Sequence, residues 1–156
     1  MRITEMVWLL LLTFAVQGLE SGCNQKQPSE CKEFFAMSIE QQEAQFRTFN
    51  LERQLKTFRC GMERRPPEIG LAYDIAKGGE KIVPALTEAL VNEKDEWMQN
   101  AIIDIFRVMS NDGYLRGKME VVQQIRDTVS RMKISRIKKE AEESLNEIER
   151  NASRSK

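Results

Sequence analysis

Apolar residues recur three or four positions apart through most of the chain that follows residue 30. This spacing places them on one side of an α-helix, so that each helix has an apolar face to bury. No segment shows the alternation of β-branched and polar residues that is typical of a strand. The sequence therefore predicts an all-α fold of about five helices.

Prolines, glycines and polar turns divide this region into helices. The "SIEQ" stretch at Ser38 is a possible capping box that opens a helix, and the apolar spacing continues it to about Met62. Breakers follow at the two prolines of "ERRPP", at Gly78-Gly79, in "NEKD" and in "SNDGY". The helices expected between them are "EIGLAYDIA", "KIVPALTEALV" and "EWMQNAIIDIFRVM", and in the last of these Trp97 is expected to lie in the core.

The C-terminal region divides into two parts by composition. We assign residues 30–133 to a helical domain and residues 134–156, which are mostly charged, to a C-terminal amphipathic helix that extends from it. The narrow apolar stripe of this helix includes Ile137, Leu145 and Ile148, and it suggests pairing with a partner. The alternative is a helix that is solvated on all sides and frays.

The middle of the chain resembles a HEAT-type helical hairpin. The matching stretch is "GGEKIVPALTEALVNEKDEWMQNAIIDIFRVM", with a proline near the start of the first helix and a short acidic turn before the second. Two such helices bury one shared face and need neighbouring helices to cover the rest. The resemblance implies a HEAT-like antiparallel core that serves protein–protein scaffolding rather than catalysis.

The N-terminus reads as an export signal. Val7 to Val16 form an apolar run of ten residues, whereas a helix that spans a membrane needs about 20. The alternative for this run is a buried N-terminal helix.

Two cleavage sites are open for an export signal. Cleavage after Gly18 by an ordinary signal peptidase would release a soluble secreted protein. The following "LESGC" resembles the processing site of bacterial lipoproteins, which implies a signal peptide over 1–22 and lipid attachment at Cys23.

Residues 23–29 are polar and contain a proline, so we expect them to form a tether between a lipid and the domain. The chain contains three cysteines, and a lipid on Cys23 leaves Cys31 and Cys60 as an even set. A disulfide between these two closes a loop of about 30 residues, worth roughly 3–4 kcal/mol of unfolded-state entropy. A Cys23–Cys31 bridge with Cys60 buried, or three free thiols, are the alternatives.

Composition excludes the commonest catalytic chemistry. Histidine is absent, which removes the usual general base and the usual metal ligand, and no Cys-x-x-Cys pair completes a metal site. The 24 basic and 24 acidic residues balance, which disfavours nucleic acid as a partner. Arg64 and Arg65 could bind a carboxylate or a headgroup of a partner, or could simply be exposed at a helix end.

We therefore expect a protein that is not an enzyme and needs neither a cofactor nor a metal. The leading hypothesis is a lipid-anchored protein of a bacterial cell envelope, on the periplasmic or surface face, that acts as an interaction or scaffold module for an unknown protein. The alternative is a soluble secreted helical-bundle binding protein, such as a ligand or an inhibitor.

Overall fold

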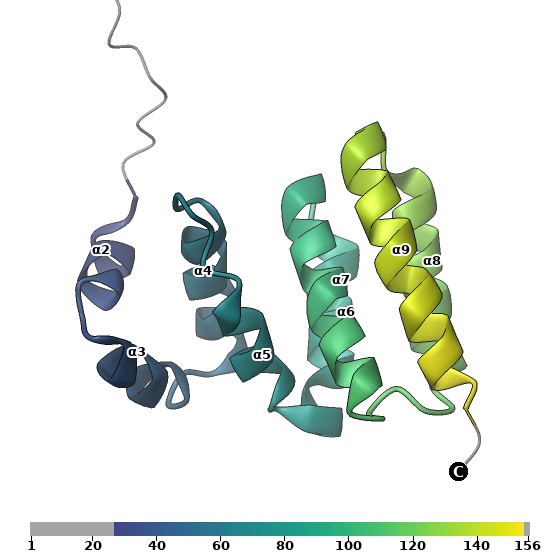
Figure 1. Cartoon of the computed structure of the whole chain (residues 1–156), viewed down its shortest axis with the longest axis horizontal. Helices are drawn as coiled ribbons and strands as arrows, with labels where there is room; N and C mark the ends of the chain where they lie inside the picture. The colour runs from purple at the N-terminus through teal and green to yellow at the C-terminus, as the bar shows by residue number, and fades with distance from the viewer. Residues whose placement is uncertain (1–26, 155–156) are drawn as a thin grey trace, which may run out of the picture.

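The computed structural model describes residues 27–154 and is all-α there, without a strand (Figure 1). Within residues 27–154 it contains eight α-helices and one short 3₁₀ helix, more than the number of about five helices expected. In chain order they are α2 (Ser29–Phe35), α3 (Ile39–Phe46), α4 (Leu51–Met62), α5 (Gly70–Ala76), η1 (Gly79–Ile82), α6 (Val83–Asn92), α7 (Glu96–Asn111), α8 (Met119–Arg131) and α9 (Ser135–Ala152).

The export signal, Cys23 and most of the tether lie outside the described residues. None of the described helices has the length and apolar character needed to cross a membrane.

The single helix expected from Ser38 to Met62 is in fact two helices, α3 and α4. The capping box at Ser38 is present, because its hydroxyl accepts from the Gln41 backbone and the Gln41 side chain accepts from Ser38 N–H. The chain leaves α3 after Phe46, and the Asn50 side chain then accepts from Arg53 N–H at 2.9 Å and caps α4. Apolar spacing alone did not reveal this break, because both helices turn their apolar residues toward the same core.

The four C-terminal helices form two antiparallel hairpins that stack on each other. Residues 93–95 connect α6 to α7, and residues 132–134 connect α8 to α9. Across the stack α7 packs on α9 and α6 packs on α8, while α5 packs on the other side of α7 (Figure 1). The helices are thus arranged in two layers, with α5, α7 and α9 in one layer and α6 and α8 in the other.

The core is continuous along this stack and is centred on α7. Its buried apolar side includes Ile102, Ile105, Phe106 and Met109, each at most 2% exposed. These residues lie at the three- and four-residue spacing expected for this helix.

Helix α9 belongs to the same core and does not project from the domain. Its apolar stripe packs against α7 and α8, and the buried residues are Ile137, Ala141, Leu145, Ile148 and Ala152. The boundary placed at residue 134 is the beginning of a helix rather than the end of the domain. The charged residues of this segment lie mainly on the side of α9 that faces away from the core.

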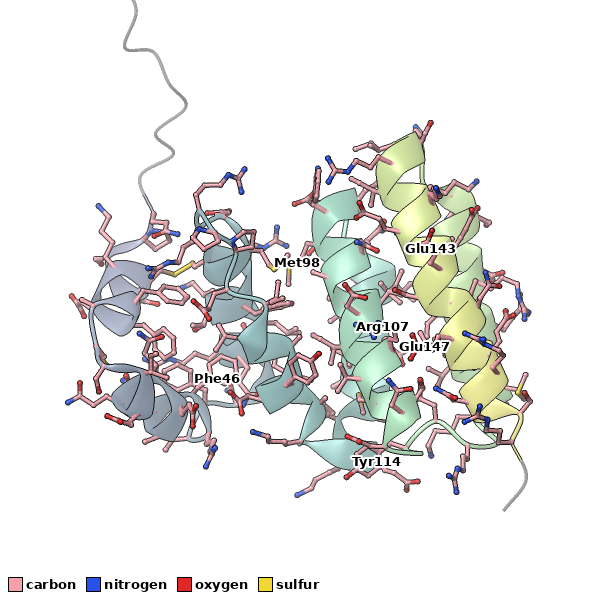
Figure 2. The ribbon with its side chains drawn as sticks, viewed as in Figure 1. Phe46, Met98, Arg107, Tyr114, Glu143 and Glu147 are labelled. Atoms are coloured by element: carbon pink, nitrogen blue, oxygen red, sulfur yellow. A yellow bond between two sulfur atoms is a disulfide. The ribbon has the colours of Figure 1, made fainter. Side chains whose placement is uncertain are left out.

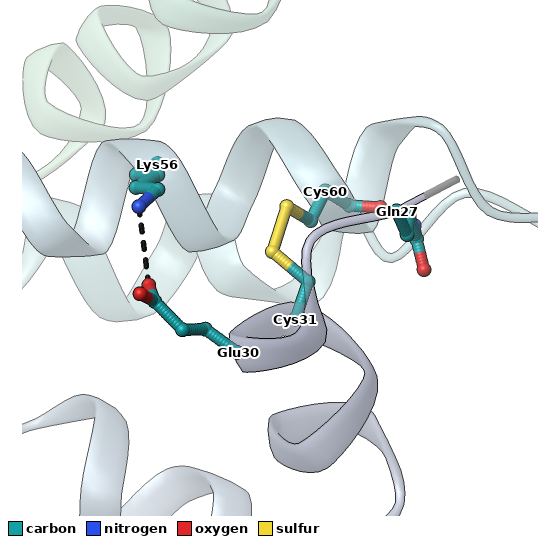
Figure 3. Close-up of a disulfide and its surroundings, with 5 residues drawn as sticks. All are labelled: Gln27, Glu30, Cys31, Lys56 and Cys60. Carbon is teal, nitrogen blue, oxygen red and sulfur yellow. Dashed lines mark hydrogen bonds and ion pairs between the residues drawn. A yellow bond between two sulfur atoms is a disulfide. The ribbon is translucent and has the colours of Figure 1, made fainter. Parts of the chain in front are cut away.

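The N-terminal helices pack through aromatic rings and a disulfide. Phe34 of α2 lies with its ring centroid 6.0 Å from those of Phe46 and Phe49. Cys31 and Cys60 form a disulfide that joins α2 to α4 (Figure 3). Gln27 supports this junction by donating its side-chain amide to the carbonyl oxygen of Cys60 at 2.8 Å.

Candidate interaction surface

A groove with a volume of about 910 Å³ runs between α6 and α8. Its lining comes from η1, α6, the connection before α8, and the first half of α8. The lining residues are Glu80, Val83, Pro84, Thr87, Glu88, Val91, Asn92, Gly117, Lys118, Met119, Glu120, Val121 and Gln124. We call this surface the α6–α8 groove.

Apolar side chains form much of the groove. Val83 is buried at its base, whereas Val91 is 48% exposed and Met119 is 51% exposed. Thr87 adds to the apolar character, because its hydroxyl donates to the Val83 carbonyl at 2.7 Å and is satisfied within α6. Large apolar side chains that remain exposed beside a hollow are a common feature of protein-binding sites.

Acidic side chains outnumber basic ones in the lining. Three carboxylates, Glu80, Glu88 and Glu120, accompany the ammonium group of Lys118. Lys118 Nζ lies 3.9 Å from Glu80 Oε1, so this cation already has an acidic neighbour. Within residues 27–154, Glu88 and Glu120 form no ion pair. The groove therefore presents an excess of negative charge.

The connection between α7 and α8 holds the groove in shape. Gly113 and Gly117 adopt φ of 82° and 71°, a region of backbone conformation that favours glycine. Leu115 between them is fully buried, and Gly117 N–H donates to the carbonyl oxygen of Ala152 at 3.2 Å. The start of α8 is thus fixed to the end of α9 and to the core.

A second hollow, of about 460 Å³, lies between the N-terminal helices and α5. Phe35, Ile39, Arg64 and Tyr73 are among its lining residues. The Arg64 guanidinium lies over the Phe35 ring, 4.5 Å from its centroid, which is a cation–π contact. Arg65 is exposed and does not line this hollow.

The proposed partner-binding stripe on the C-terminal helix is not a free surface. Ile137 and Ile148 are fully buried and Leu145 is 8% exposed, because α7 and α8 cover this side of α9.

Trp97 is not part of the core. The sequence predicts that it is buried, but its side chain is 51% exposed. It lies in the first turn of α7, next to the 93–95 connection, whereas Met98 turns toward the core.

A polar network joins α7 to α9 on the other layer of the stack. Asp104 Oδ1 accepts from Arg107 Nε at 3.2 Å and from the Ser144 hydroxyl at 2.9 Å, and Arg107 also lies 3.6 Å from Glu147 (Figure 2). Burial lowers the pKa of Arg107, but the hydrogen bond and the charges of Asp104 and Glu147 outweigh it, so that the pKa is raised. This network holds a permanent cation in place and is suited to fastening helices rather than to proton transfer.

Residues 27–154 contain no group of three or more His, Cys, Asp or Glu side chains placed to hold a metal ion. Comparisons of the chain with protein-family models, curated proteins and solved structures find no match.

Proposed function

We propose that this protein is a lipid-anchored component of a bacterial cell envelope whose helical domain binds a protein partner through the α6–α8 groove. The observation that carries the proposal is the groove itself, with exposed Val91 and Met119 held on a stack of packed hairpins. The stacking of α6 on α8 and of α7 on α9 supports a HEAT-like arrangement, in which such surfaces serve recognition.

The disulfide supports the location and the anchor. A Cys31–Cys60 bridge suits a protein that is exported to an oxidising compartment. With these two cysteines paired, the third cysteine of the chain, Cys23, has no cysteine left within the chain to pair with. A lipid on Cys23 accounts for this odd number.

Mass spectrometry of the mature protein, recovered from the membrane fraction of a bacterium that expresses the full chain, tests the anchor. We expect an N-terminus at Cys23 that carries a lipid, and we expect the Cys23→Ala variant to lose it. A soluble product that begins at Leu19 would replace the anchor with the secreted alternative, a helical binding protein such as a ligand or an inhibitor.

Photo-crosslinking tests the groove. A photoreactive residue at position 119 should link to a defined envelope protein, whereas the same residue at Asn146, exposed on α9, should not. Equal yields from both positions, or no product from either, would contradict binding through the groove.

A further inference from the structure

We infer that the partner segment in the α6–α8 groove is a basic amphipathic helix, with an apolar ridge flanked by lysine or arginine. This inference rests on the proposed function and specifies the chemistry of the partner. Three features of the groove support it: its length, the position of its apolar residues and its charge.

The dimensions of the groove suit a short helix. The lining follows α6 along all of its ten residues, which correspond to about 15 Å at 1.5 Å per residue, and it includes the first half of α8. A partner helix of about three turns has the same length. A helix laid in a groove between two other helices is a recurrent mode of peptide recognition.

The exposed apolar residues lie toward the two ends of the groove. Val91 is in the last turn of α6, beside the connection to α7, and Met119 is in the first turn of α8, beside the connection from α7. Because the sixteen residues of α7 span the distance between these two connections, Val91 and Met119 are separated along the groove. Val83 and Val121 lie in the lining between α6 and α8. A ligand that covers all four needs an apolar stripe rather than a single apolar group.

The charge of the lining selects the polar face of that ligand. Glu88 lies on α6 and Glu120 on α8, so carboxylates flank the groove on both sides, and Lys118 is next to Glu80. Lysine or arginine beside an apolar stripe would meet these carboxylates, and complementary charge favours the correct partner and speeds association. The same carboxylates repel the phosphates of lipids and nucleic acids, which disfavours both as occupants.

A designed peptide provides the probe. We would titrate the processed protein with an 18-residue helix of leucine and lysine and, separately, with the matched helix in which glutamate replaces lysine. The methionine methyl groups report the site by nuclear magnetic resonance. We expect the lysine peptide to shift the methyl signal of Met119 and to leave that of Met109, which is fully buried in the core, in place.

Paired variants separate the groove from general attraction to acidic groups. The E88Q/E120Q variant should bind the lysine peptide about threefold to tenfold more weakly, as expected for two exposed ion pairs. The E52Q/E142Q variant changes two exposed carboxylates outside the groove and should bind as the wild type does.

Several outcomes would overturn the inference: equal binding of the glutamate peptide, equal losses in the two variants, or a shift of Met119 caused by anionic vesicles. A shift of the Met119 methyl signal that depends only on protein concentration would instead assign the groove to a second copy of this chain.

The crosslinking experiment separates this inference from the proposed function. If the crosslinker at position 119 captures a partner that lacks a basic helix, the proposed function stands and this inference fails. If it captures nothing, the proposed function fails.

Discussion

Glu96, in the first turn of α7, binds the beginning of α9 with its carboxylate. Its two oxygens accept from the backbone N–H groups of Lys133 and Ile134, each at 2.9 Å. These donors have no partner within the connection itself, so a side chain from another helix supplies it. The bonds to Ile134 and then to Lys133, together with the charge of Lys133, lower the pKa of Glu96 below its ordinary value.

This lowered pKa predicts a pH dependence of stability. The contribution of Glu96 is fully present above the ordinary pKa of a glutamate and is lost as the pH falls through the lowered value of the folded state. Glu96→Gln should therefore be less stable than the wild type at pH 7, and the difference should shrink in acid. Urea unfolding at a series of pH values measures it, with Glu142→Gln, an exposed carboxyl on α9, as the control. A difference that stays constant with pH would contradict the role of the charge.

At the scale of elements, local hydrogen bonds set the helix boundaries and buried stripes set the packing. Capping residues begin α3, α4 and α7, at Ser38, Asn50 and Asp95. Asn50 is the cap that separates α3 from α4, where apolar spacing alone predicts one continuous helix. Its position shows how one side chain reorients the chain within a stretch of unbroken apolar periodicity.

Replacement of Asn50 tests this cap. Asn50→Ala removes the acceptor for Arg53 N–H and should lower the free energy of unfolding by about 1 kcal/mol. Asn50→Asp keeps an acceptor oxygen at the same place and should stay close to the wild type. Thermal or urea unfolding compares the two variants, and equal losses in both would show that the capping oxygen is not the cause.

Helix α9 gives the sharpest test of packing. Ile148 is fully buried, so Ile148→Ala should reduce the free energy of unfolding by about 2–5 kcal/mol through lost burial and a residual cavity. Asn146, two residues earlier, is exposed, and Asn146→Ala should change stability by less than about 0.5 kcal/mol. If both substitutions changed the free energy of unfolding by similarly small amounts, α9 would project from the domain, as its charge pattern suggests.

At the scale of the whole molecule, the stack is held differently at its two ends. The hairpins α6–α7 and α8–α9 share a continuous apolar core, with the polar network of Arg107 beside it. The N-terminal end relies on short helices, on the phenylalanine rings around Phe34 and on the Cys31–Cys60 disulfide. Because the disulfide stabilises only the N-terminal end, its loss should loosen the N-terminal helices before the C-terminal hairpins.

Removal of the disulfide tests this division. The C31A/C60A variant opens a loop of 29 residues and should lose up to about 3–4 kcal/mol in the chain-entropy model. Hydrogen exchange should show faster exchange in α2 and α3, with α7 still protected between α5 and α9. The wild-type protein under reducing conditions is the matched control and should behave as the variant does. Uniform acceleration through every helix would contradict the division.

The sequence by itself determined the helical class and most of the turns, and it offered a Cys31–Cys60 bridge among several arrangements of three cysteines, of which the structure has this one. The helical class depends on the spacing of apolar residues, and the helix ends depend on glycine and proline, which are both local features of the sequence. The bridge was inferred from the number of cysteines in the chain. Gly79, at a φ of 62°, lies at the predicted Gly78-Gly79 break, and the predicted "NEKD" turn ends at Asp95, which caps α7.

Only the tertiary structure decided which apolar faces stay open. The stripe of Ile137, Leu145 and Ile148 has the spacing of a partner-binding helix, and the structure buries it against α7 and α8. Val91 and Met119 also lie on amphipathic helices, and the structure leaves them exposed in a groove. Periodicity shows that a face is apolar, but whether the same chain covers it depends on how the hairpins stack, which is a matter of contacts between residues far apart in the sequence.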